Sequence, residues 1–275
     1  MIEEFKDFWS RYTPYALHPD DKESIYNSKK ANKILKNPES FFVNKDISLL
    51  NQTFFNDLKN PEHNKIFQES INPNAIHTNM YCKTFIGDIE NAKVIILYGN
   101  PGLELGDYQD EHEDKRLIHE SNNDINFNSN GFLYLSDIAK ETGGYNYWKN
   151  GNRFQKIIDG YAKGKKISHE ESLNFIKKNI CLLESIGYHS TKTPNLKPSD
   201  FPSSIITKNL VHNYLLPKAR NNELIIFSWR QSNFWGLESE SNVVIRNANA
   251  AISSYFTEYE HQSITNFLIN NQSKR

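Results

Sequence analysis

Four short aliphatic runs constrain the fold of this chain more than any other feature of its sequence. They are KVIILYG (93–99), ICLLESI (180–186), ELIIFSW (223–229) and NVVIRN (242–247). Runs this apolar, bounded by turn residues, are typical of strands covered on both faces. Segments with helical periodicity separate the runs, and strands that alternate with helices predict a parallel sheet. We therefore expect an α/β fold, namely a three-layer α/β/α sandwich with a four-stranded parallel sheet.

The N-terminal part of the chain has a different character. It contains five prolines and short amphipathic segments such as FKDFWSRY (5–12). We expect a helical N-terminal extension over residues 1–75 and one α/β domain over residues 76–275. Within that domain, the polar and acidic stretch 103–143 is the main insertion.

Charge and cysteine content exclude several classes of protein. The chain has 32 Lys and Arg against 33 Asp and Glu, so a nucleic-acid-binding surface must be local, and YAKGKK (161–166) is the best candidate run. Cys82 and Cys181 are the only cysteines, which excludes an iron–sulfur cluster held by four thiolates. The first residues lack the apolar segment of a signal peptide, and no run approaches about 18 apolar residues. We expect a cytoplasmic monomer that needs no metal or cofactor.

Ligands of such a sheet bind beyond the carboxyl ends of its strands. Two stretches place a carboxamide there: Asn100 in NPG after the first run, and Asn247 in NANAAIS after the last. A carboxamide can fix a water molecule or hydrogen-bond the polar edge of a planar base. Pro101 restricts Asn100 to extended conformations, and Gly102 leaves space beside it. A plain turn is the alternative interpretation of NPG taken alone.

Three stretches together resemble the uracil-DNA glycosylase superfamily. FIGDIENAKVIILYGNPG (85–102) is similar to the first motif of the branches that carry Asn-Pro-Gly after the first strand. GYNYWKNGNRF (144–154) resembles a segment of the mismatch-specific uracil/thymine branch, in which two aromatic residues precede Asn-Arg-Phe. NANAAIS (247–253) resembles the last motif of that branch, and the three stretches occur in the family's order.

The chain also departs from the family's pattern. Tyr98 stands where the first glycine of the first motif is usual, and Ala248 and Ala250 replace the proline and glycine of the last motif. The insertion 103–143 lengthens the distance between the first two motifs. These differences bear on the substrate more than on the fold.

The resemblance implies hydrolysis of an N-glycosidic bond in DNA, on a nucleotide rotated out of the helix. Asn100 matches the family's water-positioning asparagine, which holds a water beneath the anomeric carbon. Asn247 matches the asparagine that helps to hold the DNA and the edge of the base. No lysine is obviously placed as a nucleophile, although Lys149 and Lys156 lie near the second motif. We therefore expect a monofunctional DNA glycosylase, which releases a base without cleaving the strand.

The resemblance also implies a set of base-binding residues. Tyr147 aligns with the aromatic residue that stacks on the extruded base. Strict uracil enzymes carry a bulky aromatic residue at the position of Gly102, so this site should admit substituents on C5 of the pyrimidine. We expect Tyr108 of the insertion and His189 of GYHS (187–190) to complete the set. Structural roles, at a core edge for Tyr147 and as a hydrogen-bonder for His189, stay open as alternatives.

The DNA-binding residues implied by the resemblance lie in two places. The loop 248–253 would enter the minor groove with Ile252 as the apolar wedge, and Asn249 and Ser253 would flank it. Arg153 would either pair with a phosphate or brace the neighbouring loop.

A branch of this superfamily attacks phage DNA whose cytosines carry hydroxymethyl or glucosyl groups. The open first motif and the polar insertion are similar to that role, so we expect excision of a C5-substituted or damaged pyrimidine, in antiviral defence. Three alternatives stay open: repair of uracil or mismatched thymine, a metal-dependent hydrolase that uses the acids and histidines of GDYQDEHEDKRLIHE (106–120), and an inert protein that binds modified DNA.

Overall fold

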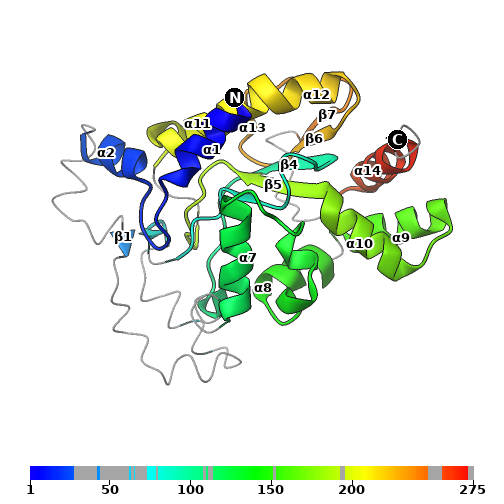
Figure 1. Ribbon diagram of the computed structural model, residues 1–275, viewed down its shortest axis with the longest axis horizontal. Coiled ribbons are helices and arrows are strands. Elements are labelled where there is room, and N and C mark those ends of the chain that lie inside the picture. Colours follow the sequence, from blue (N-terminus) through cyan, green and yellow to red (C-terminus); the bar gives the residue numbers. More distant parts are fainter. Residues whose placement is uncertain are drawn as a thin grey trace. The chain divides into compact units, whose positions relative to one another are not determined.

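The computed structural model describes most of the chain, namely residues 1–27, 42–43, 62, 65, 73–78, 80–107, 110, 114–150, 153–192, 196–246 and 256–271. Over this part the protein is mixed α/β, with a five-stranded, mostly parallel sheet (Figure 1). The α/β class expected from the sequence is thereby confirmed.

The sheet has the strand order β3-β5-β4-β6-β7. Its strands are β3 (Phe85–Ile86), β4 (Val94–Tyr98), β5 (Ile180–Glu184), β6 (Ile225–Ser228) and β7 (Val243–Ile245). The last four lie within the four aliphatic runs, as predicted. β6 pairs in parallel with both β4 and β7. The four aliphatic residues of β4 are fully buried, as expected for a strand covered on both faces.

The sheet has five strands and not the predicted four, because β3 adds a short strand at one edge. Its two residues pair antiparallel with Leu182 and Leu183 of β5. Two residues are too few to show strand periodicity in a sequence. Gly87 follows β3 with a φ of +106°, and a Cβ there would lie 2.5 Å from the carbonyl oxygen of Ile180. Only glycine therefore fits where the chain leaves this edge strand.

The chain divides into two compact units. Unit 1 consists of Met1–Thr84, Gly99–Asn122 and Glu184–Leu210, and unit 2 of Phe85–Tyr98, Asn123–Leu183 and Val211–Arg275. This division differs from the sequence-based boundary at residue 75, because the N-terminal helices share unit 1 with two segments that follow sheet strands. Boundaries drawn along a sequence do not anticipate a unit made of three separate segments.

Unit 2 contains most of the sheet and three longer helices, α9 (Gln155–Lys165), α10 (His169–Asn179) and α14 (Glu258–Asn271). α9 and α10 lie between the first two aliphatic runs, α14 follows the last run, and α9 packs against the other two. α10 begins with a capping box formed by Ser168 and Glu171, which satisfies two backbone N–H groups. The shorter helical elements are η2 (Leu133–Leu135), η3 (Asp137–Ala139), α8 (Gly143–Tyr145), the π-helices η4 (Asn146–Asn150) and η6 (Val211–Leu215), α12 (Leu216–Arg220) and α13 (Ser232–Trp235). Helix α7 (Lys115–Ile125) lies in the predicted insertion.

Unit 1 contains α1 (Ile2–Ser10), α2 (Pro19–Asn27), η5 (Pro198–Asp200), α11 (Pro202–Leu210) and a two-stranded parallel sheet of β1 (Phe42–Val43) and β2 (Ile76–His77). Phe5, Phe8 and Trp9 share one face of α1 by their helical spacing, and all three are buried. Helix α1 packs against α11. The N-terminal helices are therefore part of a core that includes residues 200 positions further along the chain.

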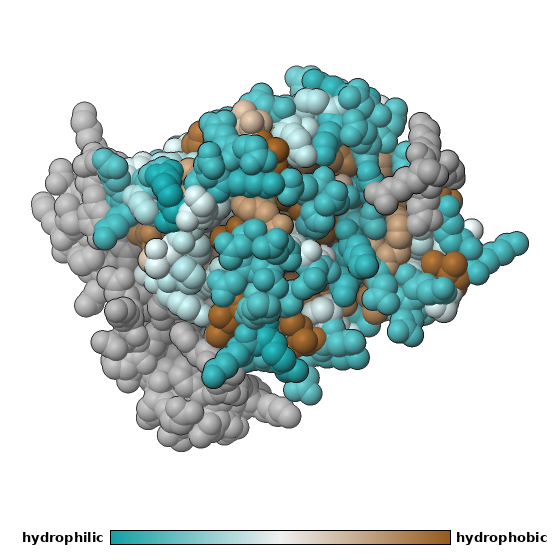
Figure 2. Space-filling view, viewed as in Figure 1, coloured by the Kyte–Doolittle hydropathy of each residue, from teal (hydrophilic) through white to brown (hydrophobic). Residues whose placement is uncertain are grey.

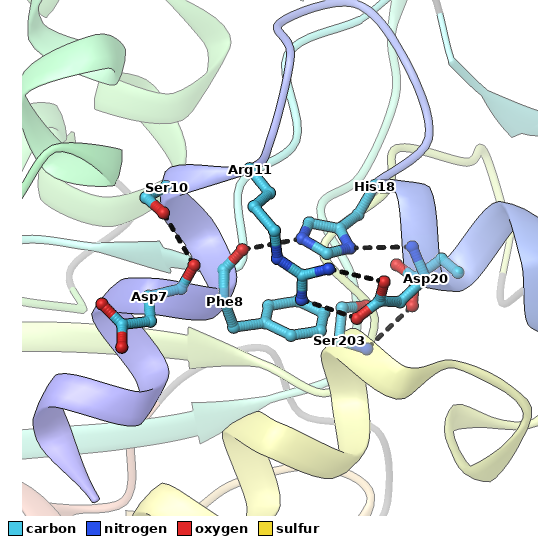
Figure 3. Close-up of polar contacts among 8 residues, drawn as sticks. Asp7, Phe8, Ser10, Arg11, His18, Asp20 and Ser203 are labelled. Atoms are coloured by element: carbon cyan, nitrogen blue, oxygen red, sulfur yellow. Dashed lines mark hydrogen bonds and ion pairs between the residues drawn. The ribbon is translucent and has the colours of Figure 1, made fainter.

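A polar cluster fixes the connection between α1 and α2 (Figure 3). Arg11 forms a two-bond ion pair with Asp20, at 2.8 and 2.7 Å. The ring of His18 stacks on Phe8, and its Nε2 donates to the Phe8 carbonyl oxygen at 2.8 Å. Since a carbonyl oxygen only accepts, Nε2 carries the proton and Nδ1 accepts from the N–H of Asp20. Burial lowers the pKa of His18, which favours the neutral ring that this pattern requires.

On the face shown in Figure 2, hydrophilic residues cover most of the described surface, and hydrophobic residues form small separate areas. Tyr259, at 68% exposure, is the most exposed of the large hydrophobic side chains that the structure describes. No helix in this part of the chain is both long and apolar enough to cross a membrane.

Candidate functional site

Asn100 belongs to the turn Asn100–Gly102 of unit 1, called here the NPG turn. Its side chain is half buried. Its Nδ2 donates to the carbonyl oxygen of Pro101 and to Oγ of Ser190, each at 2.9 Å. Both acceptors belong to unit 1, so the carboxamide is anchored within that unit.

These two hydrogen bonds determine which way the carboxamide points. The carbonyl oxygen of Pro101 can only accept, so the nitrogen of the amide must face it. Ser190 donates its own proton to the carbonyl oxygen of Lys192 at 2.6 Å, so its Oγ acts as an acceptor toward Asn100. Oδ1 of Asn100 accepts no hydrogen bond from the residues that the structure describes. Its lone pairs can therefore bind a water molecule by accepting a hydrogen bond from it.

The backbone around the NPG turn is bonded to the segment 185–190. The carbonyl oxygen of Gly99 accepts from the Ser185 hydroxyl at 2.5 Å and from the Ile186 N–H at 2.9 Å. The N–H of Ser190 donates to the carbonyl oxygen of Pro101 at 3.3 Å. A plain surface turn needs no such support, and these bonds hold the backbone of Asn100 in place.

Gly102 is exposed and surrounded by open space. Among the residues that the structure describes, a Cβ added there would meet no atom within 4 Å, and its φ lies outside the range that demands glycine. Neither the backbone nor the packing of the described residues therefore explains a glycine at this position. The role of Gly102 beside a ligand stays a prediction from the resemblance.

His189 lies beside the same turn. Its Nδ1 donates to the carbonyl oxygen of Gly102 at 2.7 Å, which fixes the proton on Nδ1. The His189 carbonyl oxygen accepts from the N–H of His77, whose side chain is fully buried. Burial, with a smaller contribution from the charge of His189, lowers the pKa of His77 to about 3. The structure thus brings three predicted site residues, Asn100, Gly102 and His189, into one hydrogen-bonded group.

Tyr147 belongs to unit 2, on the π-helix η4, an element frequent at functional sites. Its hydroxyl is hydrogen-bonded to that of Tyr98 at 2.6 Å, and its ring meets Trp148 edge to face. Trp148 is buried, whereas Tyr147 is half buried. Unlike Trp148, Tyr147 therefore keeps part of its surface accessible.

Arg153 covers one face of the Tyr147 ring. Its guanidinium carbon lies 3.3 Å from the ring centroid, and its Nη1 donates to the Tyr147 carbonyl oxygen. The side chain of Arg153 is buried, and its carbonyl oxygen accepts from His261 at 3.1 Å. These contacts support a bracing role for Arg153, which is one of the two roles expected from the sequence. A contact between Arg153 and a DNA phosphate stays a prediction.

Five predicted site residues lie outside the described part of the chain: Tyr108, Asn247, Asn249, Ile252 and Ser253. Their roles stay predictions from the resemblance.

The metal-binding alternative depended on the acidic insertion. Among the described residues, no three His, Cys, Asp or Glu side chains are grouped so that they could hold a metal ion. Glu111 and His112 of that insertion fall outside those residues. Both cysteines are buried free thiols, and burial raises the pKa of Cys181 well above its usual value.

Comparisons of the chain with protein-family models, curated proteins and solved structures find no match.

The sequence placed Ser190 beside His189 near the predicted site, as a possible contact to phosphate or base, but did not predict its bond to Asn100, and it did not predict the role of Tyr98. Ser190 anchors the amide of Asn100, and Tyr98 bonds the hydroxyl of Tyr147. For Ser190 the available signal was its place after the second aliphatic run, at the same predicted sheet edge as Asn100. For Tyr98 the signal was the departure from glycine in the first motif.

Proposed function

We propose that this chain is a monofunctional DNA glycosylase that flips out and excises a C5-substituted or damaged pyrimidine. The observation that carries the proposal is the orientation of the Asn100 carboxamide, with Nδ2 bonded inside the protein and Oδ1 left to accept from water. In the proposed reaction, Asn100 aims the water at the anomeric carbon while the bond to the base breaks.

Such a site works without a strong base. Cleavage of the glycosidic bond develops positive charge on the sugar and negative charge on the departing base, so the water needs positioning more than activation. Asn247 is proposed to bind the base edge, and a donor aimed at a developing negative charge contributes about 3 kcal/mol. Tyr147 is proposed to stack on the extruded base, and Ile252 to fill the gap that it leaves. The three-layer α/β/α arrangement belongs to the same proposal.

The environment of two lysines supports base release without strand cleavage. Lys149 donates to the hydroxyl of Tyr145 at 2.7 Å, and Lys156 lies at the surface in an ion pair with Glu258. Neither contact is the apolar or cationic surrounding that makes a lysine nucleophilic. Borohydride should therefore trap no covalent complex with DNA.

The open space at Gly102 supports a substrate that carries a group on C5. We propose hydroxymethylated or glucosylated cytosine of phage DNA, and hence a role in antiviral defence, for a cytoplasmic monomer. Uracil and mismatched thymine are the alternative substrates, and the experiment below separates them.

Mass spectrometry of released bases tests the proposal. The substrates are uracil DNA, DNA with mismatched thymine, and phage DNAs with plain or glucosylated hydroxymethylcytosine. The expected result is release of the modified cytosine, its loss in Asn100→Ala with DNA binding retained, and full release by Asn174→Ala, an exposed asparagine on α10. The same release should persist in EDTA. DNA binding without any released base would identify a binding protein instead.

A further inference from the structure

Ser190 is buried, with 1% of its surface exposed, and its hydroxyl makes two different hydrogen bonds. The hydroxyl proton goes to the carbonyl oxygen of Lys192 at 2.6 Å, and a lone pair accepts from Asn100 at 2.9 Å. A hydroxyl has only one proton, so the first bond determines the polarity of the second.

The contacts between Ser190 and the NPG turn form a closed ring. The carbonyl oxygen of Pro101 accepts both from Nδ2 of Asn100 and from the backbone N–H of Ser190. The Oγ of Ser190 closes the ring by accepting a hydrogen bond from Nδ2 of Asn100. Rotation of the carboxamide would break two of these bonds and place Oδ1 against a carbonyl oxygen. The ring therefore admits one orientation of the amide.

We propose that Ser190 is a positioning residue for the reaction, which acts by fixing the carboxamide of Asn100 and does not touch the substrate. This inference depends on the proposed function of Asn100. Without Ser190 the amide keeps only the Pro101 bond and can turn about its side-chain torsions. A reacting water misplaced by about 1 Å can cost on the order of 100-fold in rate.

Single-turnover base release by Ser190→Ala and by Ser190→Cys tests this role. Cysteine keeps the size of the side chain but accepts hydrogen bonds weakly. Both changes should lower the rate by roughly 10- to 100-fold and leave the dissociation constant for DNA within about twofold. Ser172→Ala is the matched control, because its buried hydroxyl also donates to a carbonyl oxygen, that of Ile158, at 2.6 Å. That control should lose a similar amount of stability and keep the rate.

The double variant Asn100→Ala/Ser190→Ala separates positioning from a general structural effect. If Ser190 acts only through Asn100, its loss should change nothing further once Asn100 is alanine. A second fall of the same size in the Asn100→Ala background would overturn the proposal, as would an unchanged rate in the single variant.

An NMR measurement tests the ring independently of activity. In the native protein both Nδ2 protons of Asn100 are hydrogen-bonded, so both should exchange slowly with solvent. In Ser190→Ala one of them should exchange about tenfold faster or more. Equal exchange in the two proteins would contradict the proposed anchoring. Absence of base release from every substrate, with the expected exchange behaviour, would instead refute the proposed function while retaining the anchor.

Discussion

The hydroxyl of Tyr188 donates a 2.5 Å hydrogen bond to the carboxylate of Asp21, which precedes it by 167 residues. The same hydroxyl accepts from the N–H of His18 at 2.9 Å, and the other carboxylate oxygen of Asp21 accepts from the N–H of Ser203 at 2.7 Å. All four residues are buried. Tyr188 is the immediate neighbour of His189 in the chain, so helix α2 is tied to the segment that supports the NPG turn.

Tyr188→Phe should destabilise the protein by about 2 kcal/mol, because it removes a donor from a carboxylate that stays buried. Burial already raises the pKa of Asp21, so this carboxylate depends on its hydrogen bonds. Urea unfolding measures the loss. Tyr259→Phe, at a side chain that is 68% exposed, should change stability by less than about 0.5 kcal/mol. Equal stability of the two variants would show that the Tyr188 bond contributes nothing.

Gly102→Phe should fold normally and narrow the substrate range. A Cβ there meets no described atom within 4 Å and the position is exposed, so stability should change by less than about 0.5 kcal/mol. Release of a C5-substituted base should fall about tenfold or more relative to release of uracil. Gly106→Phe is the matched control, since a Cβ there also meets no described atom within 4 Å. An unchanged ratio in Gly102→Phe would show that this position does not border the base.

The buried ring of His77 should make stability fall with acidification. Its pKa is lowered to about 3 in the folded protein, below the usual value near 6.5, so the unfolded chain binds a proton that the folded chain excludes. This contribution is complete above about pH 6.5 and is lost progressively as the pH falls toward about 3. The loss should reach about 2 kcal/mol by about pH 5. The measurement is the free energy of unfolding of the native protein and of His77→Gln as a function of pH, between about pH 6.5 and about pH 3. Parallel dependences on pH in the two proteins would contradict the prediction.

Arg246 and Glu260 form an ion pair whose side chains are only 11% and 9% exposed. Arg246→Met leaves the carboxylate of Glu260 buried without its partner and should cost about 3 to 5 kcal/mol. Lys156→Met, at a pair whose side chains are 56% and 66% exposed, should cost less than about 1 kcal/mol. Calorimetric unfolding of both variants measures the two losses of stability. A small loss of stability in Arg246→Met would mean that solvent reaches Glu260.

The strands were predictable because their signal is local. Each of the four aliphatic runs contains a strand of the sheet, helices α9 and α10 lie between the first two runs, and α14 follows the last run. The two-residue strand β3 carried no periodicity of its own. The three-segment composition of unit 1 depends on contacts such as that of Tyr188 with Asp21, which no local pattern encodes.

The candidate site was predictable to the extent that topology determines it. The positions after the first two runs identified Asn100, Gly102 and His189 as neighbours, and hydrogen bonds join these stretches. The direction of the Asn100 amide was not predictable, because it depends on where Ser190 donates its own proton. The contact of Arg153 with the Tyr147 ring was likewise not predictable, because it depends on where the fold places that ring.

The composition of unit 1 has a consequence for how the protein is synthesised. Asp21 is translated 167 residues before its partner Tyr188 and 182 residues before its partner Ser203. Until then the apolar face of α1, with Phe5, Phe8 and Trp9, has no α11 to cover it. The nascent chain must therefore carry an uncovered apolar helix until α11 (Pro202–Leu210) has been made, a state that molecular chaperones bind.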